Sequence, residues 1–171
     1  MALVVFDSGF MLIGASPAAP IRPGPDGKPG KPGELFDHLI ETFRRDGTTI
    51  ILPAPAMAEL LALPGAEPVE RLGVLQSFGN RLRVEAFGPV AAAECGDMMR
   101  RLGLGPAASG DPRQKVKFDY QIIATARTVG AIAIYSDDDG LRKRAEQIGI
   151  VSIGIWDLPG PAQPKLPFEA P

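Results

Sequence analysis

The amino-acid sequence predicts a single α/β domain in which helices cover both faces of a parallel sheet. Five short runs rich in valine, isoleucine and leucine are spaced along the chain, and segments of helical periodicity separate them. Such alternation is typical of parallel strands joined by crossover helices. The chain has 171 residues, 45% of them hydrophobic, which is enough for one domain with a sizeable core.

Short apolar runs predict the strands, and periodic apolar positions predict the helices. The strands are expected at residues 2–6, 48–52, 81–86, 131–135 and 151–155. Two of the intervening segments show the helical period most clearly, through Leu35, Leu39, Ile40 and Phe43 in one and Val116, Tyr120, Ile123 and Ala126 in the other. Each segment is long enough for a crossover helix on one face of the sheet.

Proline and glycine predict irregular chain in three places. Residues 15–33 read ASPAAPIRPGPDGKPGKPG, and their three collagen-like triplets are far too few to hold a triple helix. We therefore expect a long loop there, a second loop at residues 103–112, and a proline-rich tail after Trp156. One domain is thus expected to span residues 1–156, with residues 157–171 as its C-terminal tail.

Charge and cysteine content limit the classes of function. The net charge is −2 at pH 7, so the chain lacks the basic character of proteins held on nucleic acid mainly by their electrostatic field. Any contact with a polynucleotide is expected to be local. Cys95 is the single cysteine and cannot form an intramolecular disulfide, and the first apolar run ends at Asp7, too early for a signal or a membrane span. We expect a cytoplasmic protein without membrane contact.

Acidic residues gather at one predicted edge of the sheet. In a parallel sheet the carboxyl ends of all strands lie at the same edge, and ligands bind there. Asp7 directly follows the first predicted strand, and the three aspartates at residues 137–139 directly follow the fourth. Glu59 and Asp119 lie early in two helices that begin at this edge. Four separate pieces of sequence thus bring carboxylates to one rim.

Carboxylates in this arrangement predict a site for a divalent cation. Close carboxylates raise one another's pKa, and burial adds to this, so that a hard cation is needed to keep them ionised. Oxygen ligands suit Mg²⁺ or Mn²⁺, whereas the lack of a Cys/His cluster in the sequence argues against zinc. Such a cation activates water and neutralises charge on a phosphodiester, so hydrolysis would need no nucleophilic side chain.

Four segments of the sequence resemble the PIN domain family: VVFDSG, PAMAELL, KFDYQIIATA and IYSDDDGLRKRAEQIGI. The resemblance extends over residues 2–155. It implies a three-layer α/β/α fold with a central parallel sheet of strand order 3-2-1-4-5. It also implies a divalent-metal-dependent ribonuclease that hydrolyses phosphodiester bonds of single-stranded RNA. Many members are toxins of bacterial toxin-antitoxin pairs, so an antitoxin protein becomes an expected partner.

The resemblance also implies which acids form the site. In the family pattern, a threonine or serine at the end of the fourth strand is followed two positions later by the last acid. Counting from Ser136 gives Asp138. The expected catalytic and metal-site residues are Asp7, Glu59, Asp119 and Asp138, with Asp137 as a further metal ligand.

Basic and hydroxyl side chains near the acids are candidates for supporting roles. Arg113, Lys115 and Lys117 precede the third acid on its helix and could contact phosphates, although surface solubility explains them equally well. Ser8 and Ser136 could hydrogen-bond the acids or a metal-bound water, but serine after a strand is also common in turns. These residues are therefore secondary to the acids.

One departure from the family pattern bears on activity. Many relatives carry a further acid and a bulky apolar residue shortly after the last site acid, where this chain has Gly140 and Leu141. A second metal position is therefore expected to be weaker. An alternative follows, in which the PIN fold no longer cleaves and serves as a binding or scaffold module.

Two other metal-dependent classes are disfavoured by single positions. A phosphatase of the haloacid dehalogenase class needs a second aspartate two residues after the first, where Gly9 stands. A signalling receiver domain is phosphorylated on an aspartate after its third strand, and the segment RLRVEAFGP offers none.

Self-association is expected from the helix that begins at Pro89. It carries Val90, Cys95, Met98 and Met99, more apolar surface than one face needs if the sheet covers only part of it. We therefore expect a homodimer.

Overall fold

A computed structural model describes residues 2–15, 31–103 and 113–160 of the chain. The strands are β1 (Leu3–Phe6), β2 (Thr49–Pro53), β3 (Leu82–Glu85), β4 (Ala133–Tyr135) and β5 (Val151–Ile153). They form one parallel sheet of order β3-β2-β1-β4-β5. Val5 of β1 lies opposite Ile51 of β2 on one side and Ile134 of β4 on the other. The predicted α/β class and strand order are confirmed.

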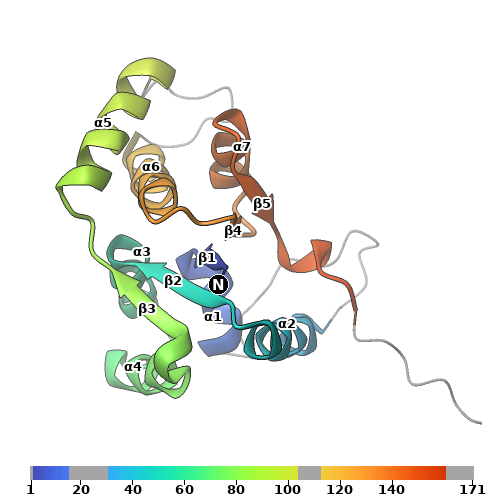
Figure 1. Ribbon diagram of the computed structural model, residues 1–171. Helices are drawn as coiled ribbons and strands as arrows, with labels where there is room; N and C mark the ends of the chain where they lie inside the picture. Colours follow the sequence, from blue (N-terminus) through green and yellow to red (C-terminus); the bar gives the residue numbers. More distant parts are fainter. Residues whose placement is uncertain (1, 16–30, 104–112, 161–171) are drawn as a thin grey trace, which may run out of the picture.

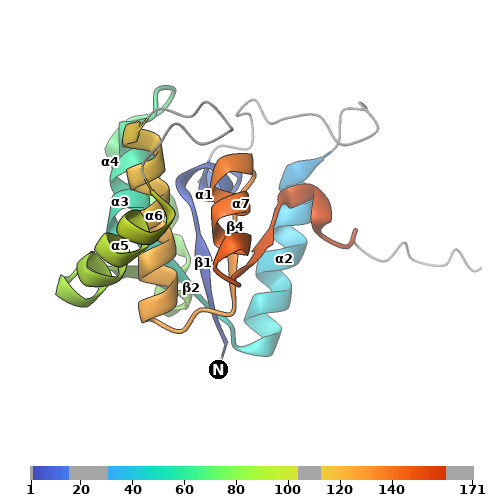
Figure 2. The ribbon, with the colours of Figure 1, turned by 90° about the horizontal axis from the view of Figure 1, so that it is seen from above.

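Helices cover both faces of this sheet. The described helices are α1 (Ser8–Ala15), α2 (Pro32–Asp46), α3 (Ala54–Ala62), α4 (Pro68–Ser77), α5 (Pro89–Leu102), α6 (Arg113–Thr128) and α7 (Asp139–Gln147), with short 3₁₀ turns η1 (Gly79–Arg81) and η2 (Ile155–Asp157). Figures 1 and 2 show α5 and α6 on one side of β1 and α2 on the other. None of the helices in the described residues is long and apolar enough to cross a membrane.

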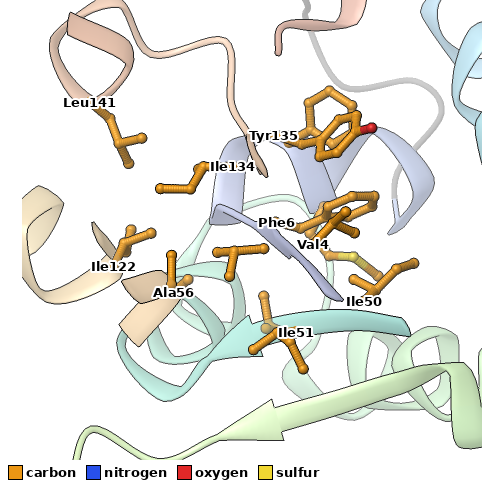
Figure 3. Close-up of a cluster of buried hydrophobic side chains, with 14 of the residues drawn as sticks. Val4, Phe6, Ile50, Ile51, Ala56, Ile122, Ile134, Tyr135 and Leu141 are labelled. Carbon is orange, nitrogen blue, oxygen red and sulfur yellow. The ribbon is translucent and has the colours of Figure 1, made fainter. Parts of the chain in front are cut away.

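Alternating side chains of the strands build a core on each face of the sheet. Phe6 and Tyr135 lie on one face, with Phe10, Phe36 and Phe43 packed around them at ring centroid distances of 4.9 to 6.2 Å. Figure 3 draws side chains of both faces, and those of the second face include Ile51 and Ile134 of the strands and Ala56, Ile122 and Leu141 of the helices. Both layers are buried, as a sheet covered on both faces requires.

Several boundaries differ from the sequence-based prediction. β4 begins at Ala133 and not at residue 131, and Ile132 before it is 63% exposed. β5 ends at Ile153, so that the buried Ile155 belongs to η2. The predicted loop at residues 15–33 falls mainly on residues 16–30, which lie outside the described residues; α1 ends at Ala15 and α2 already begins at Pro32. Most of the second loop (104–112) and of the tail (161–171) also lies outside them.

The apolar surface of α5 is smaller than the sequence suggested. Cys95 and Met98 are 1% and 2% exposed, and Met99 packs partly against the core. Since α5 packs on α6, that helix covers side chains which the sheet does not reach, and an ion pair of 3.0 Å between Arg127 of α6 and Glu94 of α5 joins the two. Val90 is the residue of this group left largely exposed. The homodimer stays a prediction. The excess apolar surface of α5 on which it was based is mostly buried within the domain.

Candidate active site

A pocket of about 800 Å³ opens at the carboxyl edge of the sheet, where β1 and β4 end as neighbours. Helices α1, α3, α6 and α7 border it. Its acidic lining consists of the predicted residues Asp7, Glu59, Asp119, Asp137 and Asp138, and its larger apolar lining residues are Leu12, Ile13, Leu63, Phe118, Ile122 and Leu141. The structure therefore brings the acids predicted from four separate segments into one pocket.

Asp7 lies where β1 ends and α1 begins. Its backbone amide donates to the Tyr135 carbonyl of β4 at 3.1 Å, which fixes the end of β1 beside β4. The residue is 5% exposed, and its carboxylate accepts hydrogen bonds from the Phe10 amide at 2.6 Å and from the Ser136 hydroxyl. Burial raises the pKa of Asp7 to about 7, against the lowering effect of these bonds, and the charged aspartates after β4 raise it further. A cation beside Asp7 would restore its charge at neutral pH.

Ser136 links Asp7 to Asp138. Its hydroxyl donates to Asp7 and accepts a hydrogen bond from the Asp138 amide at 3.0 Å. Asp138 caps α7 by accepting from the Leu141 amide at 2.9 Å, and its other oxygen pairs with Lys115 Nζ of α6 at 2.6 Å. Burial acts to raise the pKa of Asp138, but the bonds from Lys115 and Leu141 outweigh it and hold the pKa below its ordinary value. Asp138 is therefore a stably ionised carboxylate.

Glu59 reaches the pocket from α3, which packs against α1. It is exposed, and its Oε2 accepts a hydrogen bond of 2.5 Å from the hydroxyl of Ser8, the buried first residue of α1. Each of the two serines considered for supporting roles thus donates to one acid, Ser8 to Glu59 and Ser136 to Asp7. In both cases the hydroxyl orients the carboxylate without neutralising it.

Asp119 lies on the buried side of α6 and pairs with Arg144 of α7. Arg144 Nη1 is 2.6 Å from Asp119 Oδ2, and the two side chains are 6% and 7% exposed. Arg144 shares the buried stripe of α7 with Leu141 and Ala145. The sequence-based prediction did not include Arg144, although its spacing from Leu141 carried a signal. A charged residue on the apolar stripe of a helix needs a buried partner, because unpaired burial of a charge is costly.

The other two aspartates after β4 have different surroundings. Asp137 lines the pocket, but its Oδ1 accepts a hydrogen bond from the Ile155 amide at 2.8 Å, which ties the end of β4 to η2. Asp139 is the first residue of α7 and is not among the pocket-lining residues. Asp138 lines the pocket as well, and its backbone amide is hydrogen-bonded to Ser136.

The three basic residues at the start of α6 also differ in whether they line the pocket. Within the described lining of the pocket, Lys115 is present, whereas Arg113 and Lys117 are not. Arg113 and Lys117 are exposed on the surface of α6. Lys115 is thus the member of the predicted group that shares the pocket with the acids.

The PIN domain family model matches residues 33–147, which is more than half of the chain. The chain belongs to the PIN domain family. The match includes Glu59, Asp119 and Asp138, while Asp7 precedes it. The fold of this PIN domain supplies the missing acid, because β1 lies between β2 and β4 and carries Asp7 to their shared edge.

Two solved structures share the fold of this PIN domain. VapBC2 from Rickettsia felis, solved bound to a DNA fragment from its promoter, has a TM-score of 0.58 and 14% identity, covering 89% of this chain and 98% of that chain. VapC20 from Mycobacterium tuberculosis, a toxin that cleaves the sarcin-ricin loop, has a TM-score of 0.57 and 12% identity, covering 86% of this chain and 96% of that chain. At such low identity the likeness concerns the fold. No curated protein sequence shows a significant match.

The donor set of the PIN pocket fits an oxygen-preferring cation. Apart from Gln114 and Lys115, its polar side chains are carboxylates and the Ser8 hydroxyl, whose oxygens are the ligands that Mg²⁺ and Mn²⁺ prefer. As the described side chains stand, no three or more from His, Cys, Asp and Glu are grouped closely enough to hold a metal ion. Asp119 and Asp138 are instead held by Arg144 and Lys115, whereas no basic side chain in the described chain pairs with the buried Asp7. The uncompensated charge at Asp7 is the feature that a cation would satisfy.

Proposed function

We propose that this PIN domain is a divalent-metal-dependent endoribonuclease that hydrolyses phosphodiester bonds of single-stranded RNA. The observation that carries the proposal is the convergence of Asp7, Glu59, Asp119 and Asp138 in one pocket at the carboxyl edge of a PIN sheet. Perturbed acids in a cleft are the usual mark of a functional site, and the raised pKa of Asp7 belongs to this class.

The proposed roles of the chain's residues follow from their surroundings. Asp7, oriented by the Phe10 amide and the Ser136 hydroxyl, would hold Mg²⁺ or Mn²⁺ together with the neighbouring acids. When bound, the cation supplies positive charge for the phosphate and an activated water. Glu59 is the exposed acid, so it is best placed to accept a proton at the open side of the pocket. Lys115 places an ammonium group where a phosphate can bind.

Phe118 supports a single-stranded substrate. It lines the pocket next to Asp119 in the sequence, it is partly exposed, and it lies outside the ring cluster around Phe6. An aromatic ring stacks on an unpaired base with a stabilisation of about 1–3 kcal/mol, whereas a duplex keeps its base faces covered. We therefore expect Phe118→Leu to raise KM for a single-stranded RNA, and Phe118→Tyr to leave it nearly unchanged.

A toxin-like role with an antitoxin partner forms part of the proposal. The pocket combines an apolar wall, including Leu12, Leu63 and Ile122, with acidic groups, so it suits a peptide that carries apolar side chains and one basic side chain. Co-expression with the product of a neighbouring small reading frame tests this, since an antitoxin would co-purify and suppress cleavage. We also propose that the protein acts in the cytoplasm, where RNA substrates are present. A homodimer is proposed as well, and sizing in solution tests it.

The experiment that tests the enzyme is a cleavage assay on unstructured RNA with Mn²⁺ and with EDTA. We expect cleavage by the wild type with Mn²⁺ and no cleavage with EDTA or by Asp7→Asn. Asp97→Asn is the matched control, because Asp97 is a partly exposed acid of α5 that pairs with Arg100 and Arg101 and does not line the pocket. Its activity should equal that of the wild type.

A catalytically inactive binding module is the second candidate function. Gly140 stands where many relatives have an acid, and two of the four site acids are already held by basic side chains. RNA that binds the wild type without any Mn²⁺-dependent cleavage would favour this function over the nuclease.

A further inference from the structure

Two arginines of α7 have opposite surroundings. Arg142 is partly exposed and bonds Asp157 at 2.6 Å, outside the pocket. Arg144 is buried, does not line the pocket, and bonds the pocket acid Asp119 at 2.6 Å. The same helix therefore carries one arginine that anchors η2 and one that contacts a site acid. The nuclease was proposed from the positions of the acids, and the ion pair of Arg144 with Asp119 is an additional feature of the site.

We infer that Arg144 is a positioning residue that holds Asp119 as a fixed internal counter-ion and thereby limits the acidic pocket to one divalent cation. The inference rests on the proposed metal-dependent function. A guanidinium group stays charged at any pH at which the protein folds. It therefore compensates Asp119 permanently, whether or not metal is bound.

The number of cations follows from the charges that remain. Two-metal sites place their ions about 3.5–4 Å apart and need uncompensated carboxylates to hold both. Here the charge of Asp119 is already balanced, and the guanidinium next to it repels a second cation. Gly140 supplies no further carboxylate in the first turn of α7. Asp7 has no such partner in the described chain, so the single cation belongs on its side of the pocket.

The pair of Lys115 and Asp138 does not impose the same limit. Their side chains are 42% and 31% exposed, so solvent and a substrate phosphate can replace the lysine. The side chains of Arg144 and Asp119 are 6% and 7% exposed, and water cannot replace the guanidinium without opening the contact of α6 with α7. Arg144 is thus the fixed charge of the site and Lys115 the exchangeable one.

The test is the number of Mn²⁺ ions bound per chain at saturation, measured by electron paramagnetic resonance of free Mn²⁺ with the full-length protein. We expect one ion for the wild type and two for Arg144→Gln, which keeps a hydrogen-bond donor but removes the charge. Arg144→Lys keeps the charge and should bind one. Arg142→Gln removes the same charge from the same helix and should also bind one, which separates a local effect from a change in net charge.

The outcomes that overturn the inference differ from those that overturn the proposed function. One ion in Arg144→Gln, or two ions in the wild type, would overturn the role of Arg144 while leaving a metal-dependent nuclease in place. Absence of Mn²⁺ binding by the folded wild type would overturn the metal-dependent function, and the inference with it. If Arg144→Gln does not fold, the wild-type and Arg144→Lys counts decide, and two ions in either overturn the inference.

Discussion

The acidic pocket has two halves that differ in how their charge is balanced. Asp7 and Glu59 are oriented by hydroxyl and backbone N–H groups, which leave their charge in place. Asp119 and Asp138 each pair at 2.6 Å with a basic side chain from a neighbouring helix. Within the first half, Asp7 opposes folding when it is ionised without metal, whereas the ion pairs of the second half join α6 to α7 and to its N-cap. The acids of the pocket thus differ in how far their charge is compensated by basic side chains of the chain itself.

The largest effect on stability is expected from Asp119→Asn. The change removes the Asp119 charge from the buried Arg144, and breaking a buried pair on one side costs about 3–5 kcal/mol in the free energy of unfolding. Urea unfolding of the metal-free protein measures it. The double variant Asp119→Leu/Arg144→Met removes both charges and should recover most of the loss. Equal stability of Asp119→Asn and the wild type would contradict the division into two halves.

Asp7→Asn is expected to change stability in the opposite direction. The pKa of Asp7 is raised from 3.8 to about 7 in the folded protein, so its ionisation opposes folding. With about 1.4 kcal/mol for each pKa unit, the amide should stabilise the metal-free protein by up to about 4 kcal/mol at about pH 8, while cleavage is lost. A destabilised Asp7→Asn would show that Asp7 is a structural acid.

Asp7 and Asp138 are expected to make the free energy of unfolding depend on pH in opposite directions. Since the folded pKa of Asp7 is raised, its contribution is fully present below the unfolded value of 3.8 and is lost as the pH rises towards about 7. The pKa of Asp138 is lowered, so its contribution is present above the ordinary value and is lost as the pH falls through the lowered one. Urea unfolding across this range should show a fall of stability with rising pH that Asp7→Asn abolishes. The decline should persist in Asp97→Asn.

Lys115→Met is expected to have a moderate effect, mainly on substrate binding. The pair with Asp138 is partly exposed, and such pairs contribute about 0–1 kcal/mol to stability. Loss of a phosphate contact should weaken RNA binding several-fold at low salt and reduce its salt dependence. Fluorescence anisotropy with labelled RNA measures both. Lys117→Met is the control, because Lys117 lies on the same helix but does not line the pocket. If it weakens RNA binding as much as Lys115→Met does, the effect is due to general surface charge and not to a phosphate contact in the pocket.

The smallest effects are expected at the aspartates on either side of Asp138. Asp139→Asn should leave cleavage nearly unchanged, because Asp139 is not among the pocket-lining residues. Asp137→Asn should reduce cleavage less than Asp138→Asn does and should lower the melting temperature by a few degrees, since its Oδ1 holds the Ile155 amide. If cleavage falls more in the Asp137 or Asp139 variant than in the Asp138 variant, the assignment of Asp138 as the site acid two positions after Ser136 is wrong.

Much of the fold could be predicted from the sequence because its signals are local. Apolar runs marked the strands, and the resemblance to PIN domains implied their order, which is confirmed. Boundaries were less accurate: Ile132 belongs to an apolar run, yet it precedes β4 and is exposed. The short helix α1 was not predicted, since SGFMLIGA is apolar throughout and carries no clear period of its own.

The site was predictable as a set of acids but not as a pattern of charges. Position along the chain placed Asp7, Glu59, Asp119 and Asp138 at one edge. Their partners depend on how α6 packs against α7, which brings Arg144 to Asp119 across 25 residues of sequence. No local pattern specifies that contact. Burial of Asp7 likewise results from tertiary packing, and it sets the difference between the two halves of the pocket.

The central claim is that the acidic pocket binds a divalent cation through Asp7. Thermal unfolding of wild type and Asp7→Asn, with and without Mn²⁺, tests it most directly. At about 100 times its dissociation constant, a bound ion adds about 2.7 kcal/mol, which corresponds to about 5–10 °C in melting temperature for a domain of this size. We expect that shift in the wild type and little or none in Asp7→Asn, whose metal-free form should melt no lower than the wild type. Equal melting temperatures of the wild type with and without Mn²⁺, together with a destabilised Asp7→Asn, would contradict the claim and favour a binding module.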